Sequence, residues 1–499
     1  MEIYEPTKTA TNTAQAIDRQ SSNWDLRNAP KNYVFLVLFQ FGSAFFSFAS
    51  VWLITRNLGS EGYGGFIALI AASQAMQLFL NWSSFSVTRF GVQEYVETLS
   101  VSRTFWTRFL ILVVNLAIVI GFGGLWFPLL ANWLHLSSDI YWLIILHLTT
   151  AAFWVHVQMS LHAVKMPRTQ GFLLMGERFL VFVSLLILSA RSEFDLFSIV
   201  VPYVVAPVLS ISIGIFQMRK FVFSRFEIDK KFVMQVMFYS VPLAPVFIVS
   251  FISGSYLDAI FISHYLSIRD LGVYSIATQI NGILLQLPTL ANSLLVTLFI
   301  TLNQEKQTQR VLKFFNDLVP TAVLFWGILC ASTGFLGWLL IPLVFGKEFS
   351  PSAGALWILL ASTAISLPIY AGYQAVAQSR SESLVMMAAS ISAAVANIIF
   401  NFLLIPKYGL TGCAWATVAA CFVHMATYGW LLRKRLDVRF SWTFTAMVPV
   451  LGSALIFTQT QNALISLIVF AILSVVVGFV YQASIVAALE LIRNIVKRR

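Results

Sequence analysis

The sequence predicts an all-α, polytopic membrane protein with about fourteen transmembrane helices. Hydrophobic residues make up 58% of the 499 residues and charged residues only 11%, which leaves too little polar surface to cover a soluble body of this size. Apolar runs of about 20 residues, the length that crosses a bilayer as a helix, recur along almost the whole chain. We expect two six-helix lobes related by a pseudo-two-fold axis, followed by two C-terminal helices.

An internal repeat supports the two lobes. The segment Leu58–Phe66 is a glycine-rich turn between two apolar runs, and it resembles Leu266–Tyr274, which lies 208 residues later and places Gly272 over Gly64. The same offset relates the starts of two later pairs of apolar runs. Chance and the common use of glycine at turns are the alternative, but internal repeats are frequent in transporters. An even number of crossings per lobe keeps both lobes the same way up in the membrane.

Taken in order, the helices follow from where the apolar runs begin and end. The turn near Gly64 separates the first two helices, and the basic stretch 218–232 separates the sixth from the seventh. Pro242 and Pro245 remove two backbone donors from the seventh helix, so we expect it to bend or unwind there, either as a gate hinge or as an ordinary kink. The predicted helices cover residues 32–55, 63–87, 105–130, 139–163, 171–190, 194–217, 233–257, 272–301, 312–344, 352–377, 382–405, 409–432, 442–458 and 463–487.

These helices divide the chain into six parts. Residues 1–30 are polar and lack the apolar core of a signal peptide, which predicts a disordered cytoplasmic tail. The N-terminal six-helix lobe covers residues 31–217, and the basic cytoplasmic linker 218–232 joins it to the C-terminal six-helix lobe, 233–435. Two peripheral helices follow in 440–488, and residues 489–499 form a basic cytoplasmic tail.

The basic residues predict the orientation. Cytoplasmic loops of membrane proteins are rich in Lys and Arg. In this arrangement, all but six of the 32 Lys and Arg residues fall in loops on the side of the N-terminus, so both termini are expected to be cytoplasmic. The exceptions are Arg178, which lies inside a helix, and Arg56, Arg191, Arg269, Lys347 and Lys407, which lie on the opposite side.

Composition and motifs exclude several classes of function. The net charge of +11 is spread over short loops and not gathered on one element, so no nucleic-acid partner is expected. Cys330, Cys413 and Cys421 lie in apolar segments and have neither a disulfide pattern nor metal-ligand spacing. The motifs of metalloproteases, phosphate-binding loops and serine hydrolases are absent from the sequence. We therefore expect a protein that is not an enzyme, with no cofactor and no metal site.

Polar residues recur at helical spacing on the predicted helices. Serines and threonines at such positions commonly hold helices together in lipid. Amide side chains are costlier to place in hydrocarbon, which favours a hydrated cavity lined by them over simple helix packing. The amides that we assign to substrate binding are Gln77, Asn81, Asn281 and Asn292.

Three charged residues are expected inside the membrane. Glu177 and Arg178 lie six to seven residues into the fifth helix, and Asp258 lies near the outer end of the seventh. Such charges usually face a bundle interior or a water-filled path, although a purely structural pair is the alternative. Adjacent residues point about 100° apart around a helix, so we expect that Glu177 and Arg178 do not cancel each other. The permanent charge of Arg178 suits a substrate anion, whereas Glu177 and Asp258 are candidates for coupling to an ion.

Four motifs resemble the polysaccharide transporter family, the O-antigen and exopolysaccharide flippases of the multidrug, oligosaccharidyl-lipid and polysaccharide exporter superfamily. They are Leu58–Gly64, Leu271–Tyr274, Phe345–Phe349 and Asn401–Gly412, and the resemblance spans roughly residues 32–435. It implies fourteen helices in two lobes, with the first, second, seventh and eighth helices around a central cavity.

The resemblance also implies a function. The expected activity is translocation of undecaprenyl-diphosphate-linked oligosaccharide repeat units across the bacterial inner membrane by alternating access, for O-antigen, capsule or exopolysaccharide synthesis. Arg56, Arg89 and Arg178 are then the cations expected on the diphosphate or sugar route. The expected partners are this lipid-linked oligosaccharide, membrane lipid, a coupling proton or sodium ion, and a polysaccharide polymerase with its chain-length regulator. The chain lacks the several arginines deep in the first lobe that would indicate a lipid II flippase.

Two other functions compete with this one. A multidrug or organic-cation antiporter of the same superfamily would share the fold, but it would need deep carboxylates and no basic route, and Arg178 argues against it. A membrane glycan polymerase or ligase would need a long external loop with catalytic residues, and every external loop in the predicted arrangement is short.

Overall fold

The computed structural model describes residues 8–191, 194–224, 226, 228–252, 254–305, 307–433, 440–482 and 486. These residues form helices and short connections, and none of them lies in a β-strand. The all-α prediction is confirmed.

The first group of helices accounts for the chain up to residue 222. Its members are α1 (Lys8–Asn81), α2 (Ser84–Ser86), η1 (Val87–Gly91), α3 (Val92–Thr98), α4 (Ser102–Gly121), α5 (Gly123–Leu134), η2 (Ser138–Ile140), α6 (Tyr141–Ala163), α7 (Pro167–Ala190) and α8 (Leu196–Val222).

The second group follows the basic linker. Its members are α9 (Lys230–Ser240), η3 (Val241–Leu243), α10 (Ala244–Ile252), α11 (Ser255–Tyr265), α12 (Ile268–Gln304), α13 (Thr308–Lys313), η4 (Phe314–Leu318), α14 (Val319–Val344), η5 (Lys347–Phe349), α15 (Ser352–Pro368), η6 (Ile369–Tyr373), α16 (Gln374–Ser379), α17 (Ser383–Leu432), α18 (Phe440–Thr460) and α19 (Ala463–Val480).

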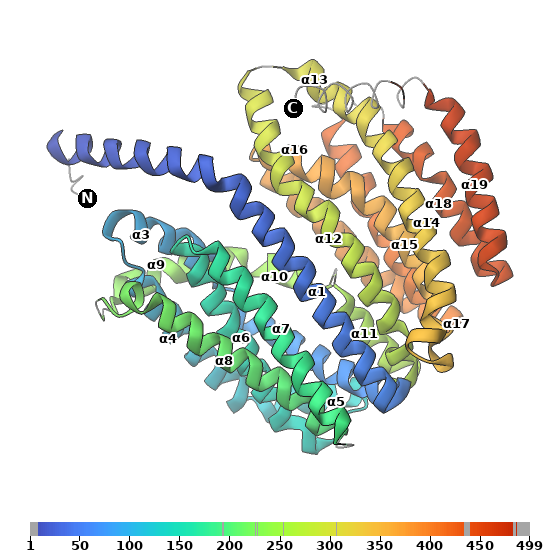
Figure 1. The fold of residues 1–499 in the computed structure, drawn as a ribbon, viewed down its shortest axis with the longest axis horizontal. Helices are drawn as coiled ribbons and strands as arrows, with labels where there is room; N and C mark the ends of the chain where they lie inside the picture. Colours follow the sequence, from blue (N-terminus) through green and yellow to red (C-terminus); the bar gives the residue numbers. More distant parts are fainter. Residues whose placement is uncertain are drawn as a thin grey trace.

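Figure 1 shows these helices gathered into two bundles, with α4–α8 in one and α12–α19 in the other. The long helix α1 runs between them and packs against both α7 and α12. Ten helices in the described part of the chain are long and apolar enough to cross a membrane. The two longest spans, Val37–Asn81 and Ser383–Leu432, have 45 and 50 residues, about twice what one crossing needs. The protein is thus a multi-pass membrane protein, and the total of fourteen crossings stays a prediction.

Several predicted boundaries differ from the structure. The predicted first and second helices are parts of α1, whose backbone turns at Gly59 with a φ of 67°, a conformation that glycine adopts without strain. The eleventh and twelfth are joined in α17 in the same way, through Gly409 with a φ of 59°. Within the predicted tail 1–30, the described residues from Lys8 onward belong to α1, and no proline interrupts the 21 residues after Lys8.

The predicted break in the seventh helix is confirmed. Its first part, α9, ends at Ser240, the turn η3 carries Pro242, and α10 begins at Ala244 just before Pro245. A second break, which we did not predict, lies at Gly254, where an extended backbone separates α10 from α11. The predicted seventh helix is therefore three short helices, separated by two breaks in the backbone.

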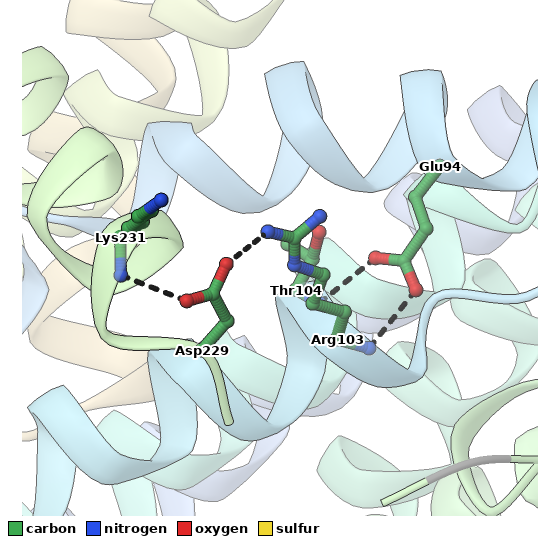
Figure 2. A network of polar contacts seen from close by, with 5 residues as sticks. All are labelled: Glu94, Arg103, Thr104, Asp229 and Lys231. Carbon is green, nitrogen blue, oxygen red and sulfur yellow. Dashed lines mark hydrogen bonds and ion pairs between the residues drawn. The ribbon is translucent and has the colours of Figure 1, made fainter. Parts of the chain in front are cut away.

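A network of polar contacts joins the first bundle to α9, as Figure 2 shows. Both carboxylate oxygens of Glu94 accept backbone N–H groups at the start of α4, from Arg103 at 2.9 Å and Thr104 at 2.8 Å. The Arg103 guanidinium then pairs with Asp229 at 2.7 Å and lies 4.1 Å from the ring centre of Phe232 in α9. Here α9, the first helix after the linker, is held on the first bundle.

At another end of the molecule the two repeat glycines bring the bundles into direct contact. A Cβ atom on Gly64 would lie 1.8 Å from the carbonyl oxygen of Ile268, and one on Gly272 would lie 2.0 Å from that of Ser60. Only glycine permits such an approach of two backbones. Ser60 also donates its N–H and hydroxyl to the Glu348 carboxylate, at 3.0 and 2.8 Å. We call this region, formed by Ser60, Gly64, Ile268, Gly272 and Glu348, the gate.

Candidate functional site

A polar cavity lies between the two bundles and has two parts. The first, which we call the tyrosine chamber, has a volume of about 280 Å³ and is lined by Tyr63, Tyr203, Tyr256 and Tyr274 among others. The second, the glutamine chamber, has a volume of about 390 Å³ and is lined by Gln40, Gln279 and Gln286 among others. The residues that line both chambers are Ser47, Arg178, Ser255, Thr278 and Gln279.

The chambers are built from the helices that the repeat relates. Both halves of α1 line the tyrosine chamber, as do α11 and α12 from the second bundle. Tyr63 and Leu271 each directly precede a gate glycine, so the tyrosine chamber lies next to the gate. The glutamine chamber lies farther along the helices, because Gln40 and Gln286 are 24 and 14 residues from Gly64 and Gly272.

Arg178 is the charged side chain that both chambers share. Its side chain is 35% exposed, whereas Glu177 is 3% exposed and turned toward α6, where it accepts a hydrogen bond from Trp154 Nε1 at 3.0 Å. We expected the two charges to point apart and not to cancel each other, but they are not fully separate. The long arginine side chain brings Nη1 to 3.8 Å from Glu177 Oε1, at the limit of an ion pair. Arg178 therefore has a nearby counter-charge and still faces the cavity.

The two chambers combine three kinds of binding group. A guanidinium donates paired hydrogen bonds to phosphate or carboxylate oxygens. Amide side chains of glutamine can both donate to and accept from hydroxyl groups, and tyrosine offers an apolar ring with a polar tip. No acidic side chain lines either chamber among the described residues. The cavity is thus suited to an anionic ligand that also carries many hydroxyl groups.

Two of the predicted amides, Gln77 and Asn81, lie inside the first bundle and not in the chambers. Asn81 Nδ2 donates to Gln77 Oε1 at 3.1 Å, and both side chains are 8% exposed. Their neighbour is Arg108 of α4, which donates to the Leu80 carbonyl at 2.8 Å and to Asn81 Oδ1 at 3.5 Å. Their role in binding substrate stays a prediction.

Arg108 is a residue that the sequence analysis missed. We assigned it to a cytoplasmic loop, but α4 begins at Ser102 and the Arg108 side chain is only 1% exposed. Its Nε and Nη1 atoms have no protein partner among the described residues. Arg108 and Arg178 thus place two arginines inside the first bundle, where we had noted the absence of deep arginines.

The other two predicted amides face the second bundle. Asn281 accepts a hydrogen bond from the Thr363 hydroxyl of α15, and Asn292 donates to Gln378 of α16 at 3.3 Å. Neither lines a chamber. The amides that do line the chambers, such as Gln74 and Gln279, lie on the same helices, and spacing alone did not distinguish the two sets.

The two remaining predicted cations lie outside the chambers. Arg56 donates to the carbonyl oxygens of Leu343 and Val344, at the end of α14, and so joins the bundles near the gate. Arg89 is exposed, and its guanidinium lies 4.6 Å from the ring centre of Tyr239 in α9. Both are placed to hold helices together, and a contact with substrate stays a prediction for each.

Asp258 lies in a separate polar cluster inside the second bundle. It is 4% exposed and accepts hydrogen bonds from Asn401 Nδ2 at 2.9 Å and from the Thr417 hydroxyl at 3.2 Å. Asn401 also donates to Asn397 Oδ1 at 3.0 Å, while its own Oδ1 has no protein partner among the described residues. We call these four residues, Asp258, Asn397, Asn401 and Thr417, the oxygen cluster. The sequence pointed to Asp258, but its partners come from two distant parts of α17.

Comparison with known proteins identifies the family. The model of the polysaccharide biosynthesis protein family matches residues 29–300, more than half of the chain. The chain belongs to this family. A relative from Haloferax volcanii, the probable low-salt glycan biosynthesis flippase Agl15, is 25% identical over 206 residues, which are 39% of this chain and 42% of the relative. The chain thus matches less than half the length of that curated relative.

Solved structures show the same fold. The lipid II flippase MurJ in an inward closed conformation has a TM-score of 0.66 at 14% identity, and the match covers 90% of this chain and 99% of that one. The MATE multidrug transporter DinF-BH has a TM-score of 0.53 at 15% identity, over 81% and 94% of the two chains. These relatives are flippases and transporters and not enzymes, which agrees with the function class that the sequence predicted.

Proposed function

We propose that the protein is a flippase that moves undecaprenyl-diphosphate-linked oligosaccharide units from the cytoplasmic to the outer leaflet of a bacterial inner membrane. The observation that carries this proposal is the position of Arg178, which faces a cavity lined by tyrosines and glutamines and by no acidic residue among those described. The diphosphate would pair with Arg178, and the sugar units would meet amide groups and aromatic rings. The polyprenyl chain would stay in lipid, since its transfer to a polar cavity is unfavourable.

The glycan flippase from Haloferax volcanii supports the same substrate class, because it is named for glycan biosynthesis. This proposal includes a role in O-antigen, capsule or exopolysaccharide synthesis, with a polymerase and its chain-length regulator as partners. It also includes cytoplasmic termini and the two lobes 31–217 and 233–435. No acidic residue lines the chambers in the described part of the chain, which weighs against an organic-cation antiporter, whose cavity would need carboxylates.

We also propose that the oxygen cluster binds the coupling ion and that this ion is sodium. Carboxylate, amide and hydroxyl oxygens are the ligands that hard cations take, and a proton would need only one of them. Asn401 Oδ1 is already buried without a protein donor, so it is available as a ligand. Binding of the cation would draw α11 toward both parts of α17, and this motion can couple ion binding to the position of α12.

A reconstituted assay tests the proposed function. The purified protein in liposomes should move a fluorescent polyprenyl-diphosphate oligosaccharide between leaflets, in a manner that depends on a sodium gradient. The same liposomes should not accumulate an organic cation such as ethidium. Uptake of the organic cation without movement of the lipid-linked sugar would favour the antiporter.

A further inference from the structure

A second cavity lies wholly within the second bundle, apart from the two chambers. It has a volume of about 520 Å³ and shares no lining residue with them. Helix α10, the segment from α15 to α16, and both parts of α17 form its walls. We call it the lateral cavity.

The inner end of the lateral cavity reaches the oxygen cluster. Asn397 and Thr417 line the cavity, and both belong to the cluster that holds Asp258. Asp258 itself does not line the cavity, so the cluster forms the end of the cavity and Asp258 lies behind it.

The other end of the lateral cavity lies at the proline break of the predicted seventh helix. Pro242 and Pro245 line it there, and both are exposed. Ser383, the exposed first residue of α17, also lines the cavity. From Ser383 to Asn397 the helix rises about 21 Å at 1.5 Å per residue, so the cavity extends over much of a membrane crossing.

Polar groups follow the length of this cavity. Ser383, Ser390 and Asn397 recur every seven residues on one face of the first part of α17, and Thr417, Cys421 and His424 share one face of the second part. The Nε2 atom of His424 is buried and has no protein partner among the described residues. Such a track between apolar helices is typical of an ion or water path.

We propose that the lateral cavity is the route by which the coupling cation moves between the oxygen cluster and the surface at Pro242 and Ser383. The cation and the lipid-linked substrate would then use different paths, which meet only through the motion of α11 and α12. The break between α9 and α10 forms the mouth of the route, so bending there would open or close it. This inference rests on the proposed coupling at Asp258.

Filling the cavity tests the route. Ser390→Trp should slow the exchange of ²²Na⁺ from liposomes at least tenfold and leave the binding of the fluorescent lipid-linked oligosaccharide unchanged. The matched control is Ala388→Trp, because Ala388 lies on the same helix, is exposed and does not line the cavity. Exchange by Ser390→Trp at the rate of the control would overturn the route.

The native thiol of Cys421 gives a second test that does not depend on the folding of a variant. Cys421 lines the cavity, whereas Cys330 and Cys413 are fully buried. A small cationic methanethiosulfonate should modify the folded protein at Cys421 and block ²²Na⁺ exchange, and Cys421→Ser should be unaffected. Complete modification with normal exchange, or no modification of the folded protein, would overturn the route.

The two proposals fail in different ways. The proposed coupling site is wrong if Asp258→Asn binds ²²Na⁺ as well as the unaltered protein does, or if neither protein binds it. In both cases the proposed cation route is wrong as well. If Asp258→Asn loses sodium binding while Ser390→Trp and the modified Cys421 exchange sodium normally, only the route is wrong.

Discussion

At the scale of single residues, Arg178 carries the electrostatics of the central cavity. Its neighbour Glu177 is fixed by Trp154 and lies 3.8 Å away, so the ion pair is long and one side of the guanidinium is left for a ligand. A pair of adjacent charges in a membrane helix can thus be compensated and still present donors to a cavity. The counter-charge lowers the cost of burying the arginine, and the cavity keeps its donors accessible.

Arg178→Ala should lower the rate of lipid-linked oligosaccharide movement by about 10- to 150-fold, since hydrogen bonds to charged groups contribute about 1.5–3 kcal/mol. Arg178→Lys should retain part of the activity, because lysine keeps the charge but cannot form the paired contact. The liposome flipping assay measures both. Arg191→Ala is the matched control, since Arg191 is exposed and caps the C-terminus of the same helix. If Arg178→Ala is inactive only because its melting temperature in detergent collapses, the charge is structural.

The sequence placed some residues correctly and others not, for a physical reason. A charge deep in an apolar run, such as Arg178, must face protein or water, so its position can be inferred from depth alone. An amide at helical spacing, such as Asn81, is satisfied equally by a cavity or by a buried partner. The partner here is Arg108, which lies on another helix whose start depends on the capping by Glu94, and no local pattern reveals that pairing.

At the scale of elements, the contact between α4 and α9 fixes the linker side of the first bundle. Glu94 caps α4, Asp229 caps α9 through the N–H of Lys231 at 2.9 Å, and Arg103 joins the two caps (Figure 2). Because both caps use carboxylates, the positive ends of two helices are satisfied at one place. The rings of Phe90 and Phe232 pack edge to face beneath them.

This contact should loosen in acid. The N–H of Lys231, and secondarily Arg103, hold the pKa of the Asp229 carboxyl below its ordinary value of 3.8. Its stabilising contribution is therefore complete above about pH 4. It is lost as the pH falls through the lower pKa of the folded state.

Arg103→Ala should increase amide hydrogen exchange in α9 at neutral pH, because α9 loses both the ion pair and the contact with Phe232. Exchange measured by mass spectrometry, corrected for the intrinsic pH effect, should differ less between the variant and the parent as the pH falls below 4. Arg219→Ala is the control, since Arg219 contacts only its own helix through Phe216 in the described structure. Equal exchange in parent and variant at neutral pH would show that the aromatic packing alone holds α9.

The sequence anticipated the elements well where glycine or proline decides the backbone. The proline break lies where Pro242 and Pro245 predicted a change of direction, and the turn at Gly59 lies within the predicted glycine-rich turn Leu58–Phe66. The break at Gly254 and the merging of the tail into α1 were not anticipated, because hydropathy alone does not show where an extended residue interrupts an apolar run.

At the scale of the whole molecule, the repeat explains how the two bundles meet. The equivalent glycines of the two halves lie against each other's backbone at the gate, so the internal symmetry places two small residues at one crossing. Figure 1 shows the bundles converging toward the end that holds α5 and α11 and separating toward α3 and α13. In this structure the two bundles are in contact at the gate. If the proposed flippase works by alternating access, this arrangement is the state that is closed at the gate.

Opening of the gate should follow from a single added side chain. Gly64→Val places a Cβ atom 1.8 Å from the Ile268 oxygen, which the closed state cannot accommodate without separating the two backbones. Overpacking of this kind costs about 1–3 kcal/mol, which corresponds to a shift of about 5- to 150-fold in the equilibrium between states. A cysteine placed at Ser255, which lines both chambers, should then react faster with an impermeant thiol reagent added from the gate side.

Gly272→Val should have the same effect, because its Cβ would lie 2.0 Å from the Ser60 oxygen. Gly65→Val is the matched control, since the nearest atom to its Cβ is 4.0 Å away. If Gly64→Val leaves the labelling of Ser255→Cys at the level of Gly65→Val, the two glycines do not hold the gate, and the state seen here must be closed by the contacts of Ser60 with Glu348 and of Arg56 with the end of α14.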